Sequence, residues 1–124
     1  MATISRYTAS IAVSITSGTS LSGGVNIGAG PILALYIPTG WTAAAITFQG
    51  SLDGGTTYAN LFDDAGVEVT IASASIATGA AQVYANASVL EKLAALQFIK
   101  IRSGTSGTPV NQTSTMNLVI GVKG

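Results

Sequence analysis

The stretch ITFQGSLDGGTTYANLFDDAGVEVTI, residues 46–71, decides the fold of this chain. Its first eight residues alternate apolar or small side chains with polar ones, which is the period-two pattern of a strand with one buried face. Residues 53–55, Asp-Gly-Gly, supply a turn signal that leads into a second strand over residues 57–62. A second turn, residues 63–66, leads into a third strand over residues 67–72. The stretch therefore predicts a β-hairpin that continues as a meander.

Strands are predicted on both sides of this meander, over residues 10–16, 32–37, 97–102 and 114–123. Residues 25–27 and 82–87 read either as short strands or as loops, so the pattern allows seven, eight or nine strands. The helix signal is the pair Ser88 and Glu91, spaced as a capping box, which predicts one short helix over about 88–96. We expect an all-β fold, an antiparallel β-sandwich or jelly-roll-like arrangement with that one helix.

The composition fits one domain whose surface is covered by other proteins. The chain has 124 residues, of which 48% are apolar and only 8% are charged, and its formal net charge is zero. We expect a single domain over residues 1–124, with an N-terminal arm, residues 1–9, that can extend from it. A surface with so little charge suits a freely soluble monomer poorly, because solubility relies on net charge and small apolar patches. An oligomer or an assembly component is expected.

The sequence argues against nucleic acid and membrane as partners. Its five basic residues are scattered along the chain and cannot form a stripe that follows phosphates. Polar or small residues interrupt every apolar run before it is long enough to span a bilayer. The opening MATISRYTAS has neither the basic nor the continuous apolar region of a secretory signal, so we expect synthesis in the cytoplasm.

The sequence lacks most of the residue types that enzymes use for catalysis. Histidine and cysteine are both absent, which removes the commonest general base, the commonest metal ligands and the thiol nucleophile. Asp53, Asp63 and Asp64 each lie where a turn uses an aspartate side chain, and Glu91 lies where a helix uses a cap. We expect no enzyme activity, no cofactor and no bound metal.

Two weaker alternatives use the carboxylates. A pair such as Asp63 and Glu68 facing each other across a cleft would suit a glycosidase-like hydrolase. The cluster of Asp63, Asp64 and Glu68 would suit calcium, although it lacks the alternating ligands of an EF-hand loop. The pairs Gly23-Gly24 and Gly54-Gly55 are read as turn glycines, because no helix follows either pair to bind a phosphate.

The aromatic residues are read mainly as core. Phe48 and Phe62 are expected inside, and Val67 is expected on the same buried face as Val69 and Ile71. Trp41 follows a Pro-Thr-Gly turn, where its ring can close the edge of the core or contact a partner.

Residues 37–71 and 98–112 resemble small β-sandwich proteins encoded among the structural genes of tailed phages. The resemblance is carried by IPTGW at residues 37–41, SLDGGTTY at residues 51–58 and IKIRSGT at residues 99–105, in that order. It implies a virion protein, and within that class a capsid decoration, or cement, protein that binds the outside of the head. Such proteins commonly form homotrimers that bridge subunits of the major capsid protein. A tail, baseplate or head-fibre component is the alternative within the same class.

The partner interface is expected on the termini and the long loops, which can drape over a neighbour or add a strand to it. These segments are residues 2–10, 17–30 and 103–113. The residues singled out as candidate contacts are Arg6, Tyr7, Trp41, Arg102, Pro109 and Asn111. A carbohydrate-binding module is the competing function, because the S-x-D-G-G hairpin also occurs in such modules and Trp41 could stack on a sugar.

Overall fold

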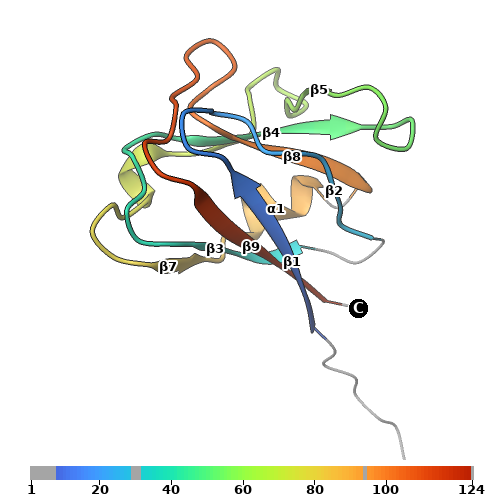
Figure 1. The fold of residues 1–124 in the computed structure, drawn as a ribbon. Helices are drawn as coiled ribbons and strands as arrows, with labels where there is room; N and C mark the ends of the chain where they lie inside the picture. The colour runs from blue at the N-terminus through green and yellow to red at the C-terminus, as the bar shows by residue number, and fades with distance from the viewer. Residues whose placement is uncertain (1–7, 29–31, 94, 124) are drawn as a thin grey trace, which may run out of the picture.

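A computed structural model describes residues 8–28, 32–93 and 95–123. Two antiparallel sheets pack face to face in it (Figure 1). The strands are β1 (Thr8–Ile15), β2 (Val25–Asn26), β3 (Ile32–Ile37), β4 (Ile46–Ser51), β5 (Ala59–Asn60), β6 (Thr70–Ile71), β7 (Gln82–Tyr84), β8 (Phe98–Ser103) and β9 (Met116–Lys123). Sheet A has the order β1-β9-β3-β7, and sheet B has the order β2-β8-β4-β5, with β6 also paired to β4.

The order of the strands is that of a jelly roll. Along the chain β1, β2, β3 and β4 fall alternately in sheet A and sheet B, and the last strand, β9, returns to lie between β1 and β3. Double-sheet jelly rolls are built in this way from two interleaved Greek keys. The predicted all-β, antiparallel sandwich with one short helix is therefore confirmed. Both segments that the sequence left open, around residues 25 and 83, contain short strands.

The core lies between the two sheets and follows the period-two patterns of the long strands. On β9 the four alternate residues Met116, Leu118, Ile120 and Val122 are all buried. On β4 the buried apolar residues are Ile46 and Phe48, which meet Ile99 and Ile101 of the neighbouring β8 in one cluster. Because successive side chains of a strand point to opposite faces, the residues between these positions point out of the sandwich.

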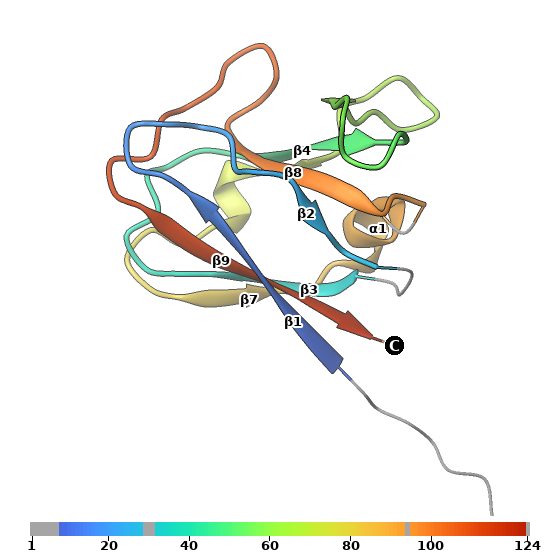
Figure 2. The ribbon, with the colours of Figure 1, turned by 45° about the vertical axis from the view of Figure 1, so that its right-hand side comes forward.

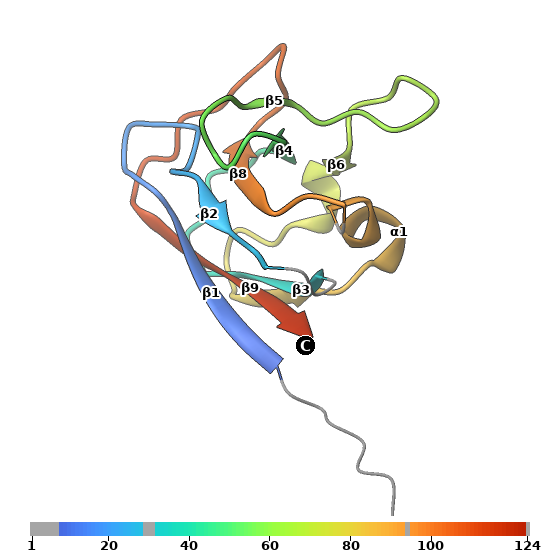
Figure 3. The same cartoon turned by 90° about the vertical axis from the view of Figure 1, so that its right-hand side faces the viewer.

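A short helical segment lies between the sheets at one end of the sandwich (Figure 3). It consists of α1 (Ala87–Leu90) and a following 3-10 turn, Glu91–Leu93, and a separate 3-10 turn spans Ser73–Ser75. Leu90 and Leu93 are each 1% exposed and belong to the core cluster. The expected capping box is wrong, since the cap is Asn86. Its side-chain oxygen accepts hydrogen bonds from the backbone N–H and the hydroxyl of Ser88.

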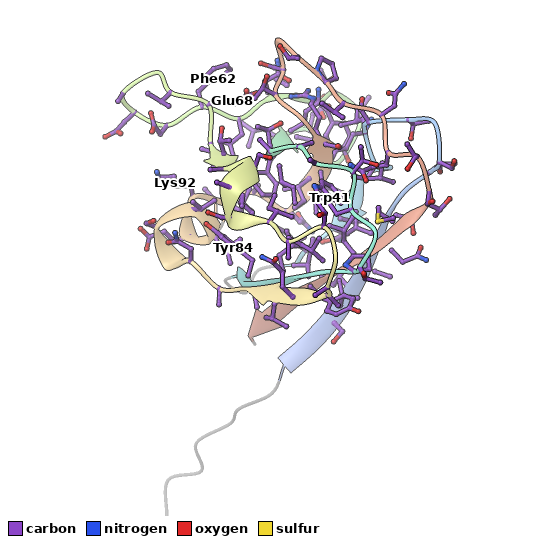
Figure 4. The ribbon with its side chains drawn as sticks, turned by 90° about the vertical axis from the view of Figure 1, so that its left-hand side faces the viewer. Trp41, Phe62, Glu68, Tyr84 and Lys92 are labelled. Carbon is purple, nitrogen blue, oxygen red and sulfur yellow. The ribbon has the colours of Figure 1, made fainter. Side chains whose placement is uncertain are left out.

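Three apolar residues are not where the sequence pattern puts them. Phe62 and Val67 were expected in the core, yet they are 50% and 60% exposed. Both lie in the hairpin around residues 61–69, whose only bridge there is between Phe62 and Glu68, beyond the edge of sheet B. Leu52 is 89% exposed, because β4 ends at Ser51 and the chain turns away from the sandwich. Phe62 is visible at the periphery in Figure 4.

Candidate partner-binding surface

The outer face of sheet A carries no charged residue among the side chains that the structure describes. Its outward residues are small, polar or apolar: Ser10, Ala12, Ser14, Ala34, Tyr36, Val83, Asn117, Val119 and Gly121. We call this set the uncharged face. It spans all four strands of the sheet, and no other described element is stacked on it (Figures 1 and 3).

An apolar row crosses the uncharged face at its middle. The strand register places Ala12 opposite Val119, Val119 opposite Tyr36, and Tyr36 opposite Val83. Directly opposed residues on one face of a sheet have neighbouring Cβ atoms, so these four side chains form a continuous line. Val83 is 66% exposed and Tyr36 is 38% exposed. The row is thus both contiguous and accessible, unlike single apolar residues scattered over a surface.

The outer face of sheet B, in contrast, is covered by the chain's own loops. Tyr58 lies over it, with the Lys100 ammonium 4.5 Å from the centre of its ring. The Tyr58 hydroxyl packs so closely on Gly24 that a side chain there would displace the Tyr58 ring. Gly24 leaves room for this contact. The predicted turn at Gly23-Gly24 is wrong, because neither glycine lies in a turn or has a positive φ. Gly54 and Gly55, with φ values of 75° and 88°, are turn glycines as expected.

Arg102 is enclosed in the same layer. It is 7% exposed, its Nη2 donates a 2.6 Å hydrogen bond to Asn60, and its Nη1 lies 3.4 Å from both Thr47 Oγ1 and the Glu68 carboxylate. The carboxylate of Glu68 also accepts the backbone N–H of Ser106 at 3.1 Å. Buried charges persist in proteins when they are paired and hydrogen-bonded in this way. This arginine holds the hairpin and the loop of residues 104–110 against sheet B.

The long loop of residues 103–113 is anchored by Gln112, which is fully buried. The Gln112 amide donates to the backbone oxygen of Thr42 at 3.0 Å and to Ser103 Oγ at 2.7 Å, and its oxygen accepts the backbone N–H of Thr42 at 2.8 Å. The backbone of Gln112 pairs with Gly18 and Thr19. One side chain and its peptide groups thus join three loops at one end of the sandwich.

The structure separates the six candidate contact residues into three groups. Arg6 and Tyr7 lie outside the described residues. Pro109 and Asn111 are exposed, so the expectation of a partner contact stands for both as a prediction. For Trp41 and Arg102 that expectation is corrected. The indole of Trp41 is 2% exposed and donates to the Ala44 oxygen at 3.1 Å (Figure 4), and the guanidinium of Arg102 is occupied by the chain itself. Of the predicted N-terminal arm, residues 1–9, the last two belong to strand β1, and residues 1–7 lie outside the described residues.

The burial of Trp41 also removes the main support for sugar binding. An aromatic ring must expose its face to stack on a sugar, and this indole closes the core instead. Exposed Leu52 borders a shallow pocket of ≈ 430 Å³. The pocket is lined by Gly50, Leu52, Asp53, Thr57, Ala59, Asn60, Leu61 and Leu96, and so has no aromatic platform.

Two aspartates act as turn residues, as the sequence predicts. The Asp53 carboxylate accepts backbone N–H groups of Thr57 at 2.8 Å and Thr56 at 3.2 Å, and the hydroxyl of Ser51 at 2.7 Å. These bonds, the one from Thr57 above all, lower the pKa of Asp53 to about 2. The Val67 backbone N–H similarly holds the pKa of Asp63 below its ordinary value. Within the described residues no three acidic side chains gather closely enough to hold a metal ion.

The comparisons with known proteins leave the surface as the main guide to function. The chain matches no protein-family model and no curated protein. Among the described residues, no helix is both long enough and apolar enough to cross a membrane.

Proposed function

We propose that this chain is a structural virion protein of a tailed phage, a capsid decoration protein that binds the outside of the head through the uncharged face. The observation that carries the proposal is the contrast between the two layers. Sheet B uses its own loops to cover its outer face, whereas sheet A leaves Tyr36, Val83 and their neighbours uncovered. An uncharged surface with an exposed apolar row suits contact with another protein, and the resemblance implies the major capsid protein as that partner.

The fold and the sequence add support of a weaker kind. Jelly rolls occur in viral capsid domains and in lectins, and the motifs at residues 37–41, 51–58 and 99–105 resemble those of phage structural proteins. The exposed loop residues Pro109 and Asn111 offer a second contact at the end of the sandwich. Several modest contacts on a repeating shell would give strong attachment through avidity.

The test is co-sedimentation of the purified chain with expanded capsids that lack it. Two valine variants are matched for it: Val83→Lys lies on the uncharged face at 66% exposure, and Val67→Lys lies on the opposite layer at 60% exposure. We expect Val83→Lys to weaken capsid binding at least tenfold, because it desolvates a charge in the contact, and Val67→Lys to bind like the wild type. A chain that ignores capsids, or equal binding by both variants, contradicts the proposal. If the chain binds tails or baseplates instead of capsids, the uncharged face would be a contact surface in that part of the particle.

A further inference from the structure

The described edges of the two sheets differ sharply in length. β1 has eight residues and pairs with β9 along its whole length, in eight consecutive pairs without a shift of register. The edge strand at the other side of sheet A, β7, has three residues. The outer strands of sheet B, β2, β5 and β6, have two residues each. All edges except β1 are thus too short to pair with another chain to any extent.

The β1 edge also lacks the other devices that keep edges from pairing. Natural proteins protect long edges with charged residues, proline, a bulge or a covering segment. The sequence of β1, TASIAVSI, has neither charge nor proline, and its register with β9 shows no bulge. Within the described residues no strand pairs with its outer side. Figure 3 shows β1 at the outer edge of the sheet beside β9, whereas the two strands cross in projection in Figure 2. At about 3.3 Å per residue it presents roughly 26 Å of backbone in which every second residue directs its N–H and C=O outward.

We propose that the β1 edge pairs with the β1 edge of a second copy of this chain, antiparallel about a two-fold axis at Ala12. A two-fold axis places each residue opposite a residue on the same face of the other copy. With the axis at Ala12, Ser10 meets Ser14 on the outer face and Ile11 meets Val13 on the inner face. These pairs join polar with polar and apolar with apolar residues, and β1 has no charged residue that would face its own copy. Ile11, which is only partly buried at the rim of the core, gains a neighbour.

The inference does not rest on the proposed function, and it departs from the trimer that the resemblance implies. A two-fold contact closes after two copies, so it produces an even number of chains, either two or, if it joins trimers, six. Paired in this way, sheet A becomes one continuous sheet of eight strands. The uncharged faces of both copies then lie side by side on one surface.

Sedimentation equilibrium over micromolar concentrations tests the edge directly. The wild type is expected to contain two or six chains, whereas Ala12→Lys, which brings two charges together at the axis, should raise the dissociation constant at least tenfold. Ala59→Lys is the matched control, because Ala59 is also an exposed alanine in an edge strand, but in sheet B. It should associate like the wild type. A monomer, a species of three chains, or an Ala12→Lys variant that associates normally overturns the inference.

A cysteine placed at the axis tests the register. The chain has no cysteine of its own, so Ala12→Cys is the only thiol. Opposed residues of antiparallel strands have Cα atoms about 4.5 to 5.5 Å apart, which is within the range of a disulfide. Oxidised Ala12→Cys should form a covalent dimer, whereas Ser14→Cys, roughly 13 Å from its own copy in this register, should not. The opposite pattern overturns the proposed register. Self-association is measured without capsids, and capsid binding is tested with Val83→Lys at the opposite edge of sheet A, so failure of the edge contact and failure of the capsid-binding role are distinguishable.

Discussion

Replacing Gln112 by methionine tests whether one buried amide holds the loop end of the sandwich together. Methionine has nearly the length of glutamine, so Gln112→Met removes hydrogen bonds and leaves little cavity. The backbone N–H and C=O of Thr42 and the hydroxyl of Ser103 each lose their partner in the Gln112 side chain. A buried polar group left unpaired costs about 1 to 3 kcal/mol. Because Thr42 is only partly buried, we expect a total loss of about 3 kcal/mol in the free energy of unfolding.

Urea unfolding followed by the fluorescence of Trp41 measures this loss. Trp41 is the single tryptophan and is 2% exposed, so unfolding changes its surroundings completely. At unchanged m-value the midpoint should fall, and the melting temperature should drop by about 10 °C. The neighbouring Asn111→Ala, at an exposed residue, should change stability by less than about 0.5 kcal/mol. A Gln112→Met variant within about 1 kcal/mol of the wild type would refute the role of the amide.

Three further predictions concern the loops that cover sheet B and can be checked by the same unfolding assay. Glu68→Ala should cost about 3 kcal/mol, because Arg102 then keeps its buried charge without its anionic partner. Gly24→Ala should cost about 1 to 3 kcal/mol by displacing the tyrosine above it, whereas Gly23→Ala, which meets open space, should cost less than about 0.5 kcal/mol. Asp53 has a pKa of about 2 against an ordinary 3.8, so its contribution to the free energy of unfolding is complete above pH 4 and is lost as the pH falls towards 2. In Asp53→Ala the free energy of unfolding should therefore depend less on pH in this range.

The opposite result in each case has a definite meaning. A neutral Glu68→Ala would show that the remaining donors and acceptors satisfy Arg102 without the carboxylate. Equal effects at the two glycines would show that the tyrosine moves aside at no cost. If stability falls at acid pH in Asp53→Ala as it does in the wild type, other carboxylates cause that fall. Asp63 would be the first of these, because its pKa is also lowered.

The strands were predictable wherever one face is buried along a long strand. The alternation of apolar and polar residues in β1, β4 and β9 predicted both the strands and the residues that point inward. Such strands have only one register that buries the apolar residues, because a shift by one residue would turn all of them towards solvent. The same reasoning failed for Phe62 and Val67. Their hairpin alternates as a strand does, but it extends past the sheet, where no second layer faces it. Local pattern reports which residues share a face and not whether anything lies opposite that face.

The surface was predictable only in its overall character. A charge content of 8% pointed to covered surfaces without showing which face is bare. Arg102 was expected at a partner contact, as arginine is mostly exposed in proteins, but it is buried. Its enclosure depends on Glu68 and Asn60 arriving from a distant hairpin, and on a loop closing over them. The role of Gln112 was equally hidden, since its partners are 70 and 9 residues away in the sequence.

The position of β9 between β1 and β3 determines when sheet A can form during synthesis. Ser14 and Asn117, neighbours in the finished sheet, are 103 residues apart in the chain. The strand that both β1 and β3 require is the last of the nine described strands along the chain, so sheet A cannot form until β9 has been synthesised. Pairings this distant in sequence make folding slow, and β1 waits with both of its edges unsatisfied. A factor that shields β1 until β9 has been synthesised would therefore raise the yield of folded protein.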